Sequence, residues 1–297
     1  MSPTSRLRRA LVDRAAAQWI ALGVALAGPE DETVVDLEAL IALTAEVGDD
    51  DSRVREGAID WCAAYGEAVH VGRMRVVAAE MGVPGDRLGP FAALVAEAGG
   101  PRWPVATQPP YRYRSRGKVH VRDLRGPARR QWRLRAAYGV NARADILAAL
   151  ILRADHYITL ADLARATRFT KRNVAVTTRS LQLACLVEIE RVGNEQRVRL
   201  SRDPLFRAWL GVVPQALDLD WPARFAAALE ALRFASAERT TAPVVRAIDA
   251  RALVERLGPA IRRLGLPEPD TAALGGAFDG AFDRWLDELA VHLSPNP

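Results

Sequence analysis

The sequence predicts a mainly α-helical protein, in which three central helices and a two-stranded hairpin lie between helical N- and C-terminal domains. Apolar residues recur at helical spacing over 1–98 and 204–297, two alternating runs lie at 186–200, and Pro and Gly break the pattern after residue 98. Of the 297 residues, 49% are hydrophobic, enough for one sizeable core or several smaller ones. We expect four segments: a helical domain at 1–98, a Pro- and Arg-rich basic linker with a lead-in helix at 99–140, the central segment at 141–203, and a helical domain at 204–297.

Five helices are expected in the N-terminal domain. In the first, Leu7, Leu11, Ala15 and Trp19 recur every four residues, as on one helix face. Glycine tolerates the left-handed backbone that ends a helix, so Gly48 and Gly66 are expected stops. The five expected helices cover about 5–27, 35–47, 52–65, 71–81 and 90–98.

Three helices are clearest in the C-terminal domain, at 222–235, 251–264 and 276–293. Proline lacks a backbone N–H and clashes with the preceding turn, so Pro259 is expected to start a new helix or to kink this one.

Composition excludes several classes of protein. Only two cysteines occur, Cys62 and Cys185, which excludes a disulfide scaffold and fits a reducing compartment. The four histidines are scattered without metal-ligand spacing, and the chain has neither a P-loop nor a GxSxG motif. We therefore predict no metal, no cofactor and no enzymatic activity.

The N-terminus has some features of a signal sequence, because arginines precede an apolar stretch at 19–27. Asp13, Arg14 and Gln18 interrupt the approach to that stretch, and the spacing is that of an ordinary helix. No apolar run approaches the length of a membrane span. The expected location is cytoplasmic.

Positive charge is concentrated in one segment. The formal net charge is +5, and 111–136 holds ten Arg or Lys and one acid, or +9. A bias toward arginine codons explains abundant arginine but not its clustering. The segment could contact nucleic-acid phosphates, pack as a helix with solvated arginines, or meet an acidic protein surface. Its candidate contact residues are Arg112, Arg114, Arg116, Lys118, Arg129, Arg130 and Arg133.

The central segment has the clearest local pattern. A helix is expected at 142–152, a short second helix from Thr159, a turn at 166–169, and a third helix at 171–184 capped by Thr170. The runs 186–192 and 196–200 alternate around Gly193-Asn194, which predicts a hairpin.

This order of elements resembles the winged helix-turn-helix of bacterial MarR-like and ArsR-like regulators, over about 60 residues. The resemblance rests on Ile158-Thr-Leu-Ala-Asp-Leu-Ala and on Thr170-Lys-Arg-Asn-Val-Ala-Val-Thr-Thr-Arg-Ser-Leu-Gln-Leu-Ala-Cys-Leu-Val. Many such domains carry glycine where Cys185 stands, so this chain departs from them at the entry to the wing. The resemblance implies a DNA-binding domain whose third helix reads the duplex.

The third helix has the two faces that such a role requires. Val174, Thr178, Leu181 and Cys185 recur at spacings of 4, 3 and 4 and are expected to form an inward stripe. The opposite face and the wing then carry donors suited to base edges and phosphates. The candidate DNA-contacting residues are Thr170, Lys171, Arg172, Asn173, Val176, Arg179 and Gln182 on the helix, and Arg191, Arg197 and Arg199 on the wing.

The sequence therefore favours a transcriptional regulator that binds double-stranded DNA, with a homodimer as a possible assembly. The alternative is a protein-interaction module, such as an antitoxin-like or phage-defence partner encoded in the same operon, because winged helices also bind proteins.

Overall fold

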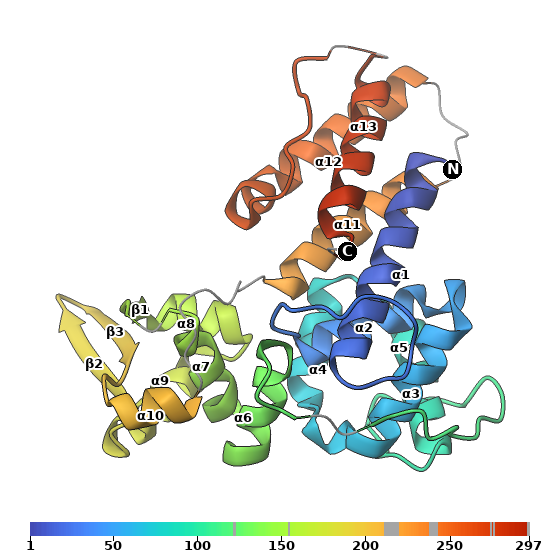
Figure 1. Ribbon diagram of the computed structural model, residues 1–297. Helices are drawn as coiled ribbons and strands as arrows, with labels where there is room; N and C mark the ends of the chain where they lie inside the picture. Colours follow the sequence, from blue (N-terminus) through green and yellow to red (C-terminus); the bar gives the residue numbers. More distant parts are fainter. Residues whose placement is uncertain are drawn as a thin grey trace.

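The computed structural model describes residues 1–120, 123–153, 155–210, 220–237, 243–273, 275 and 277–295. Within these residues the chain forms thirteen α-helices and a three-stranded antiparallel sheet, which confirms the mainly α-helical prediction. Figure 1 shows the sheet and the helices beside it at one end, and the helices of both chain termini in the remaining part. No helix in the described ranges is long and apolar enough to cross a membrane.

We call the larger part the large unit. It contains helices from both ends of the sequence: α1 (Pro3–Ala21), α2 (Leu37–Val47), α3 (Ser52–Tyr65), α4 (Val71–Glu80), α5 (Gly85–Glu97), α11 (Trp221–Ser236), α12 (Pro243–Leu264) and α13 (Ala277–Leu293). Short 3₁₀ turns follow α2 and α3, at Gly48–Asp50 and Gly66–Ala68.

One hydrophobic core joins the two ends of the chain. Leu11 and Trp19 of α1 belong to the same buried cluster as Phe225 of α11 and Phe282 of α13. Arg14 of α1 adds polar contacts, because its Nε donates to the carbonyl of Leu293 at 2.7 Å. The expected N- and C-terminal helical domains therefore share a single core, and Figure 1 shows α1 beside α13.

Helix α1 ends at Ala21, six residues before the expected end. Gly23 adopts a left-handed φ of 101°, which turns the chain out of the helix. Val24 then pairs with Val119 in an isolated β-bridge, and the amide of Ala25 donates to the carbonyl of Lys118 at 3.0 Å. The apolar run after Trp19 thus continues the core in extended backbone, which periodicity alone does not distinguish from helix.

Two prolines lie inside helices. Helix α5 starts at Gly85, before Pro90, and α12 continues through Pro259 as one helix of 22 residues. Of the two expectations for Pro259, the start of a new helix is wrong, and a kink within the helix stays a prediction. Val254, Leu257 and Ile261 lie on both sides of this proline and are all buried, so packing outweighs the lost hydrogen bond. The expected first residue of the last helix, Gly276, lies outside the described residues.

The smaller part is called the small unit. It contains α7 (Ala142–Ile151), β1 (Ile158–Thr159), α8 (Leu160–Thr167), α9 (Lys171–Leu183), β2 (Val187–Val192), β3 (Glu195–Leu200) and α10 (Pro204–Leu210). The strands lie in the order β1-β3-β2, and the register pairs Glu188 with Arg199 and Ile158 with Val198. The two-residue strand β1 is absent from the sequence prediction, which placed Thr159 at the start of the second helix.

Helix α6 (Arg130–Tyr138), preceded by a 3₁₀ turn at Pro127–Arg129, connects the two units. Trp132 belongs to the core of the large unit, where its ring meets Trp61 edge-on and Tyr65 at a tilt, at centroid distances of 5.1 and 4.9 Å. Leu134 belongs to a second cluster with Leu147, which is the core of the small unit. The boundary between the two cores therefore falls within one turn of α6.

Candidate nucleic-acid interface

Helix α9 forms as the sequence predicts and presents one face to the small-unit core. The Thr170 side chain accepts a hydrogen bond from the amide of Asn173 at 3.2 Å and so caps the helix. Val174, Thr178 and Leu181 are buried in the core, with at most 1% of their surface exposed. The expectation that Cys185 continues this stripe is wrong, because the backbone leaves the helix there with a φ of 59° and the side chain is exposed. Because this stripe faces inward, the remaining side chains of α9 point away from the core.

The outward face of α9 carries most of the predicted contact residues. All of the following are exposed: Lys171, Arg172, Asn173, Val176, Arg179 and Gln182. Within the described part of the chain, Lys171, Arg172 and Arg179 make no ion pair or side-chain hydrogen bond. The segment 170–187 also contains no acidic residue, so this face has uncompensated positive charge.

The arginines of the hairpin are placed differently. Arg197 pairs with Glu195 at 2.8 Å, and the Nε of Arg191 donates to the carbonyl of Gly193 at 3.1 Å. Arg199 is buried, binds Glu188 directly across the strands, and lies over the ring of Tyr157 at 4.5 Å. The prediction that Arg199 contacts DNA is therefore corrected, because its charge is already satisfied within the sheet.

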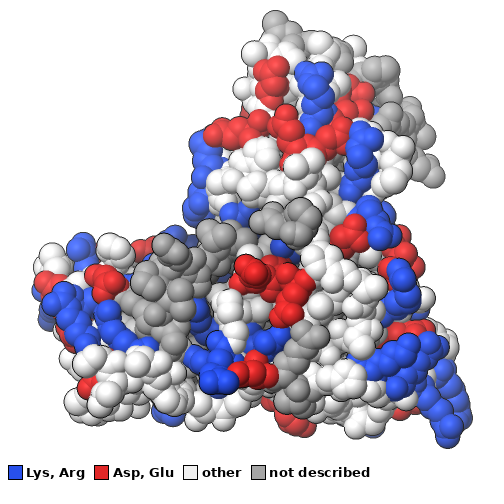
Figure 2. Space-filling model, in the orientation of Figure 1, with Lys and Arg blue, Asp and Glu red and all other residues white. Residues whose placement is uncertain are grey.

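The basic linker divides into an exposed part and a buried part. Arg112, Arg114, Arg116 and Lys118 are exposed on the large unit, where Arg116 pairs with Glu56 at 3.1 Å. On the face drawn in Figure 2, Lys and Arg atoms appear over both units, with acidic atoms between them. Positive charge on this face therefore does not form one continuous surface.

The other three predicted linker residues belong to the region around α6. Arg129 donates to the carbonyl of Ala21 at 2.5 Å and pairs with Glu30 at 2.6 Å. Arg130 is 3% exposed, and Arg133 is half-buried with a hydrogen bond to the carbonyl of Leu210. Burial lowers the pKa of Arg133. The prediction that Arg129 and Arg130 contact phosphate is corrected, because α6 lies between the two cores and buries them.

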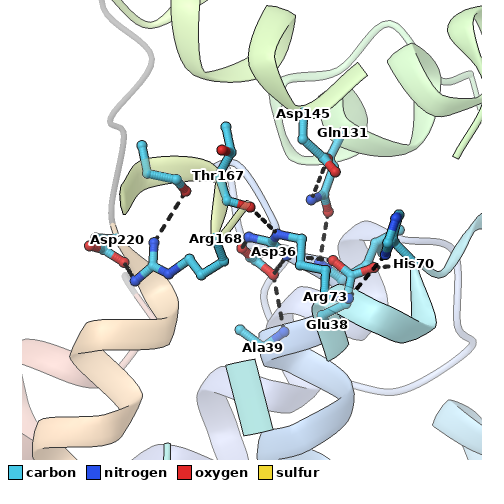
Figure 3. Close-up of polar contacts among 12 residues, drawn as sticks. Asp36, Glu38, Ala39, His70, Arg73, Gln131, Asp145, Thr167, Arg168 and Asp220 are labelled. Carbon is cyan, nitrogen blue, oxygen red and sulfur yellow. Dashed lines mark hydrogen bonds and ion pairs between the residues drawn. The ribbon is translucent and has the colours of Figure 1, made fainter. Parts of the chain in front are cut away.

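A cluster of charged side chains joins α6 and α7 to the large unit (Figure 3). We call it the buried charge cluster: Asp36, Glu38, Arg73, Arg135 and Asp145. Arg135 and Glu38 are both completely buried and lie 2.5 Å apart, and Arg135 also pairs with Asp145 at 2.9 Å. The Glu38 carboxylate also binds Arg73 at 2.5 Å, so one acid of α2 meets arginines from α4 and α6.

The pKa values in this cluster follow from burial and pairing. Burial alone would raise the pKa of Asp36, but Arg73 beside it holds that pKa at about 2. Burial likewise opposes the charged form of Glu38, and Arg135 and Arg73 together lower its pKa. The carboxylates of Asp36 and Glu38 are therefore ionised, and they form buried ion pairs with the arginines rather than neutral contacts.

A second group of contacts surrounds the turn between α8 and α9. We call it the turn cluster: Arg73, Glu80, Thr167, Arg168 and Asp220. The Nε of Arg73 donates to the carbonyl of Thr167 at 3.0 Å. Arg168 pairs with Glu80 of α4 at 2.8 Å and with Asp220, the cap of α11, at 2.6 Å. Figure 3 shows Arg73 and Arg168 extending from the two units toward each other's elements.

Sequence reasoning missed both clusters. The one local signal is Glu38, a charged residue among Leu37, Leu40 and Ile41 in a helix that is buried on nearly all sides. Its partners come from residues about 35 and 97 positions further along the chain, so nothing local identifies them.

No group of three or more His, Cys, Asp or Glu side chains suited to a metal ion occurs among the described residues. Comparisons with models of protein families, with curated proteins and with solved structures found no match to this chain.

Proposed function

We propose that residues 141–203 form a winged helix-turn-helix that binds double-stranded DNA through the outward face of α9. The order α7, α8, α9 and then the β2–β3 hairpin supports this proposal. The turn of 168–170 separates α8 from α9, and β1 completes the small sheet beside the hairpin.

The observation that carries the proposal is the unpaired positive charge on α9. Across the described residues most arginines bind an acid or a carbonyl, yet Lys171, Arg172 and Arg179 do neither. Such groups stay fully hydrated and attract phosphate over several ångströms, and arginine also forms bidentate hydrogen bonds with guanine. Asn173 and Gln182 add amide groups of the kind that pair with adenine.

The helix itself has a suitable position for entry into a major groove. Its inward stripe fixes it on the small-unit core, while its first turn is capped and exposed. The backbone amides of that first turn, together with the helix dipole, favour a phosphate near Lys171 and Arg172. On the hairpin, Arg191 is the exposed basic residue without an acidic partner among the described residues, so we assign the wing a minor part.

The test is fluorescence-anisotropy binding of full-length protein to duplex DNA across a salt series. One probe has a random sequence, and one comes from the region upstream of the protein's own gene. We expect Arg172→Ala/Arg179→Ala to weaken binding at least about 10-fold and to reduce the salt slope by about 2, since each lost phosphate contact removes about 0.9.

The matched control is Arg75→Ala/Arg102→Ala, which removes the same charge from exposed residues of the large unit. This variant is expected to bind nearly as well as the wild type. Equal losses in both variants would indicate nonspecific attraction rather than an interface on α9. No binding of the wild type at low salt would reject the DNA proposal.

One observation favours a protein partner as the second candidate. Val176 and Leu183 lie seven residues apart on α9 and are 63% and 87% exposed. Exposed apolar side chains at this spacing suit a groove or helix on another protein. Val176→Ser/Leu183→Ser should abolish capture of such a partner while leaving the salt slope for DNA unchanged.

A homodimer would place two α9 helices on successive half-sites of a palindrome, about one turn of DNA apart. Sedimentation velocity with and without a palindromic duplex measures this directly. A single protein per duplex at saturation would reject the dimer.

A further inference from the structure

The turn that precedes α9 packs on the small-unit core through Phe169 and is also held by polar contacts from the large unit. Arg168 adopts a left-handed φ of 58° at the end of α8. A residue with a Cβ adopts this conformation at a cost, and it persists where the surroundings determine it. Here the guanidinium of Arg168 binds Glu80 through two nitrogens, at 2.9 and 2.8 Å, and Asp220 at 2.6 Å.

Helix α4 supplies most of the partners of this turn. Its residue Arg73 satisfies the carbonyl of Thr167, which as the last residue of α8 has no partner within the helix. The ring of His70, the cap of α4, meets Phe169 edge-on at 5.1 Å. Helix α4 and its cap therefore contact each of the three residues that precede the cap of α9 at Thr170, namely Thr167, Arg168 and Phe169.

Apolar packing does not replace these contacts. The hydrophobic clusters of the two units are separate, and a cavity of about 100 Å³ lies between them, lined in part by Asp36, Arg73, Arg168 and Asp220. The other firm attachment is α6, whose Trp132 and Leu134 belong to different cores. Because the small unit is attached both at α6 and at the turn, a rotation about α6 would break the contacts of the turn.

We propose that Arg168 is a positioning residue that fixes the orientation of α9 relative to the large unit, through Glu80 and Asp220. The positioning role of Arg168 does not depend on the proposed function. Its consequence rests on that function: when α9 binds DNA, the large unit sets the angle at which α9 meets the duplex. Arg168 itself is turned toward the large unit, with a side chain only 7% exposed, and makes no DNA contact.

The variant Arg168→Gly removes the side-chain contacts without changing the backbone conformation. Glycine adopts a left-handed φ without strain, so the turn keeps its conformation while the three ion-pair contacts are lost. Glu80 and Asp220 are about one-third exposed, at 34% and 30%, so water solvates them in the variant. The matched control is Arg165→Ala, which removes the same charge from α8 but breaks only the local pair with Asp162.

The orientation is measured without DNA, by the distance between two spin labels. One label sits on the exposed native Cys185, beside the end of α9, and the other on Val291→Cys, 77% exposed on α13; the buried Cys62 stays unlabelled. We expect a broader or shifted distance distribution in Arg168→Gly and no change in Arg165→Ala. Glu80→Gln removes the charge of one partner of Arg168 on the large unit. We expect it to change the distance distribution in the same way but by less.

The DNA measurement gives a second and independent result. Arg168→Gly should weaken duplex binding about 3- to 10-fold with an unchanged salt slope, because no phosphate contact is lost. An unchanged distance distribution in Arg168→Gly would overturn the positioning role, whatever the affinity. A changed distribution in a protein that binds no DNA would support the positioning role and reject only the proposed function.

Discussion

At the scale of single residues, Cys185 shows how a side chain is kept in an unfavourable backbone conformation. It has a φ of 59° directly after α9. The amide of Cys185 donates to the carbonyl of Gln182 at 2.9 Å. The amide of Leu186 donates to the carbonyl of Leu181 at 3.0 Å. These two hydrogen bonds are those of a Schellman motif, whose left-handed position glycine fills most easily.

We therefore expect Cys185→Gly to stabilise the protein. Relief of the left-handed strain outweighs the added freedom of the unfolded chain, by about 0.5–1 kcal/mol. Thermal unfolding followed by circular dichroism measures the gain. Cys185→Ala is the control, because it removes the thiol but keeps the Cβ; a gain of the same size there would show that the thiol, not the backbone, is unfavourable.

At the scale of elements, the sequence predicted those whose signals are local. Thr170, the stripe at Val174 and Leu181, and the Gly193-Asn194 turn specify α9 and the hairpin within a short window. The strand β1 was missed, because two residues become a strand only when β3 lies beside them. Exposure of α9 could be predicted from its periodicity alone.

Arginines show the limit of the same reasoning. Arg129 and Arg172 are alike in sequence, each within a basic run, yet one is buried and the other exposed. The difference arises from distant partners, since Glu30 and the carbonyl of Ala21 meet Arg129 only after folding. A local count of charge therefore overestimates the surface available to phosphate.

Helix α6 supports a prediction about the buried charge cluster. Arg135→Met leaves Glu38 and Asp145 buried with fewer positive partners, and removal of one member of a buried pair costs about 3–5 kcal/mol. Chemical denaturation measures this loss of unfolding free energy. Arg8→Ala is the control, since its pair with Asp50 is exposed at the surface and contributes at most about 1 kcal/mol.

The loss of unfolding free energy in Arg135→Met should also depend on pH. In the wild type the lowered pKa of Glu38 adds stability above the unfolded pKa, and this is lost as pH falls through the folded pKa. In the variant only Arg73 still lowers the pKa of Glu38, so burial raises that pKa relative to the wild type and the carboxyl takes up a proton more readily as pH falls. The deficit is therefore largest near pH 7 and shrinks toward pH 4; a deficit independent of pH would contradict this account.

At the scale of the whole molecule, the division of the chain into two cores determines how it should unfold. Leu7 and Leu11 of α1 and Phe282 and Leu289 of α13 share one buried cluster, although residues 22–276 separate the two helices. The small unit has its own core and connects to the large unit through α6 and through polar contacts. Elements that share a core lose their contacts together, whereas separate cores can open separately.

Native-state hydrogen exchange across a denaturant series should therefore show two cooperative units. Amides of α1 and α13 are expected to exchange with the same free energy of opening and the same denaturant dependence, because neither helix keeps its buried face without the other. Amides of α9 and β3 should exchange through a separate opening of lower free energy and smaller denaturant dependence. Arg168→Gly should lower the second free energy and leave the first unchanged. Exchange of α13 at a lower free energy than α1 would contradict the single shared core.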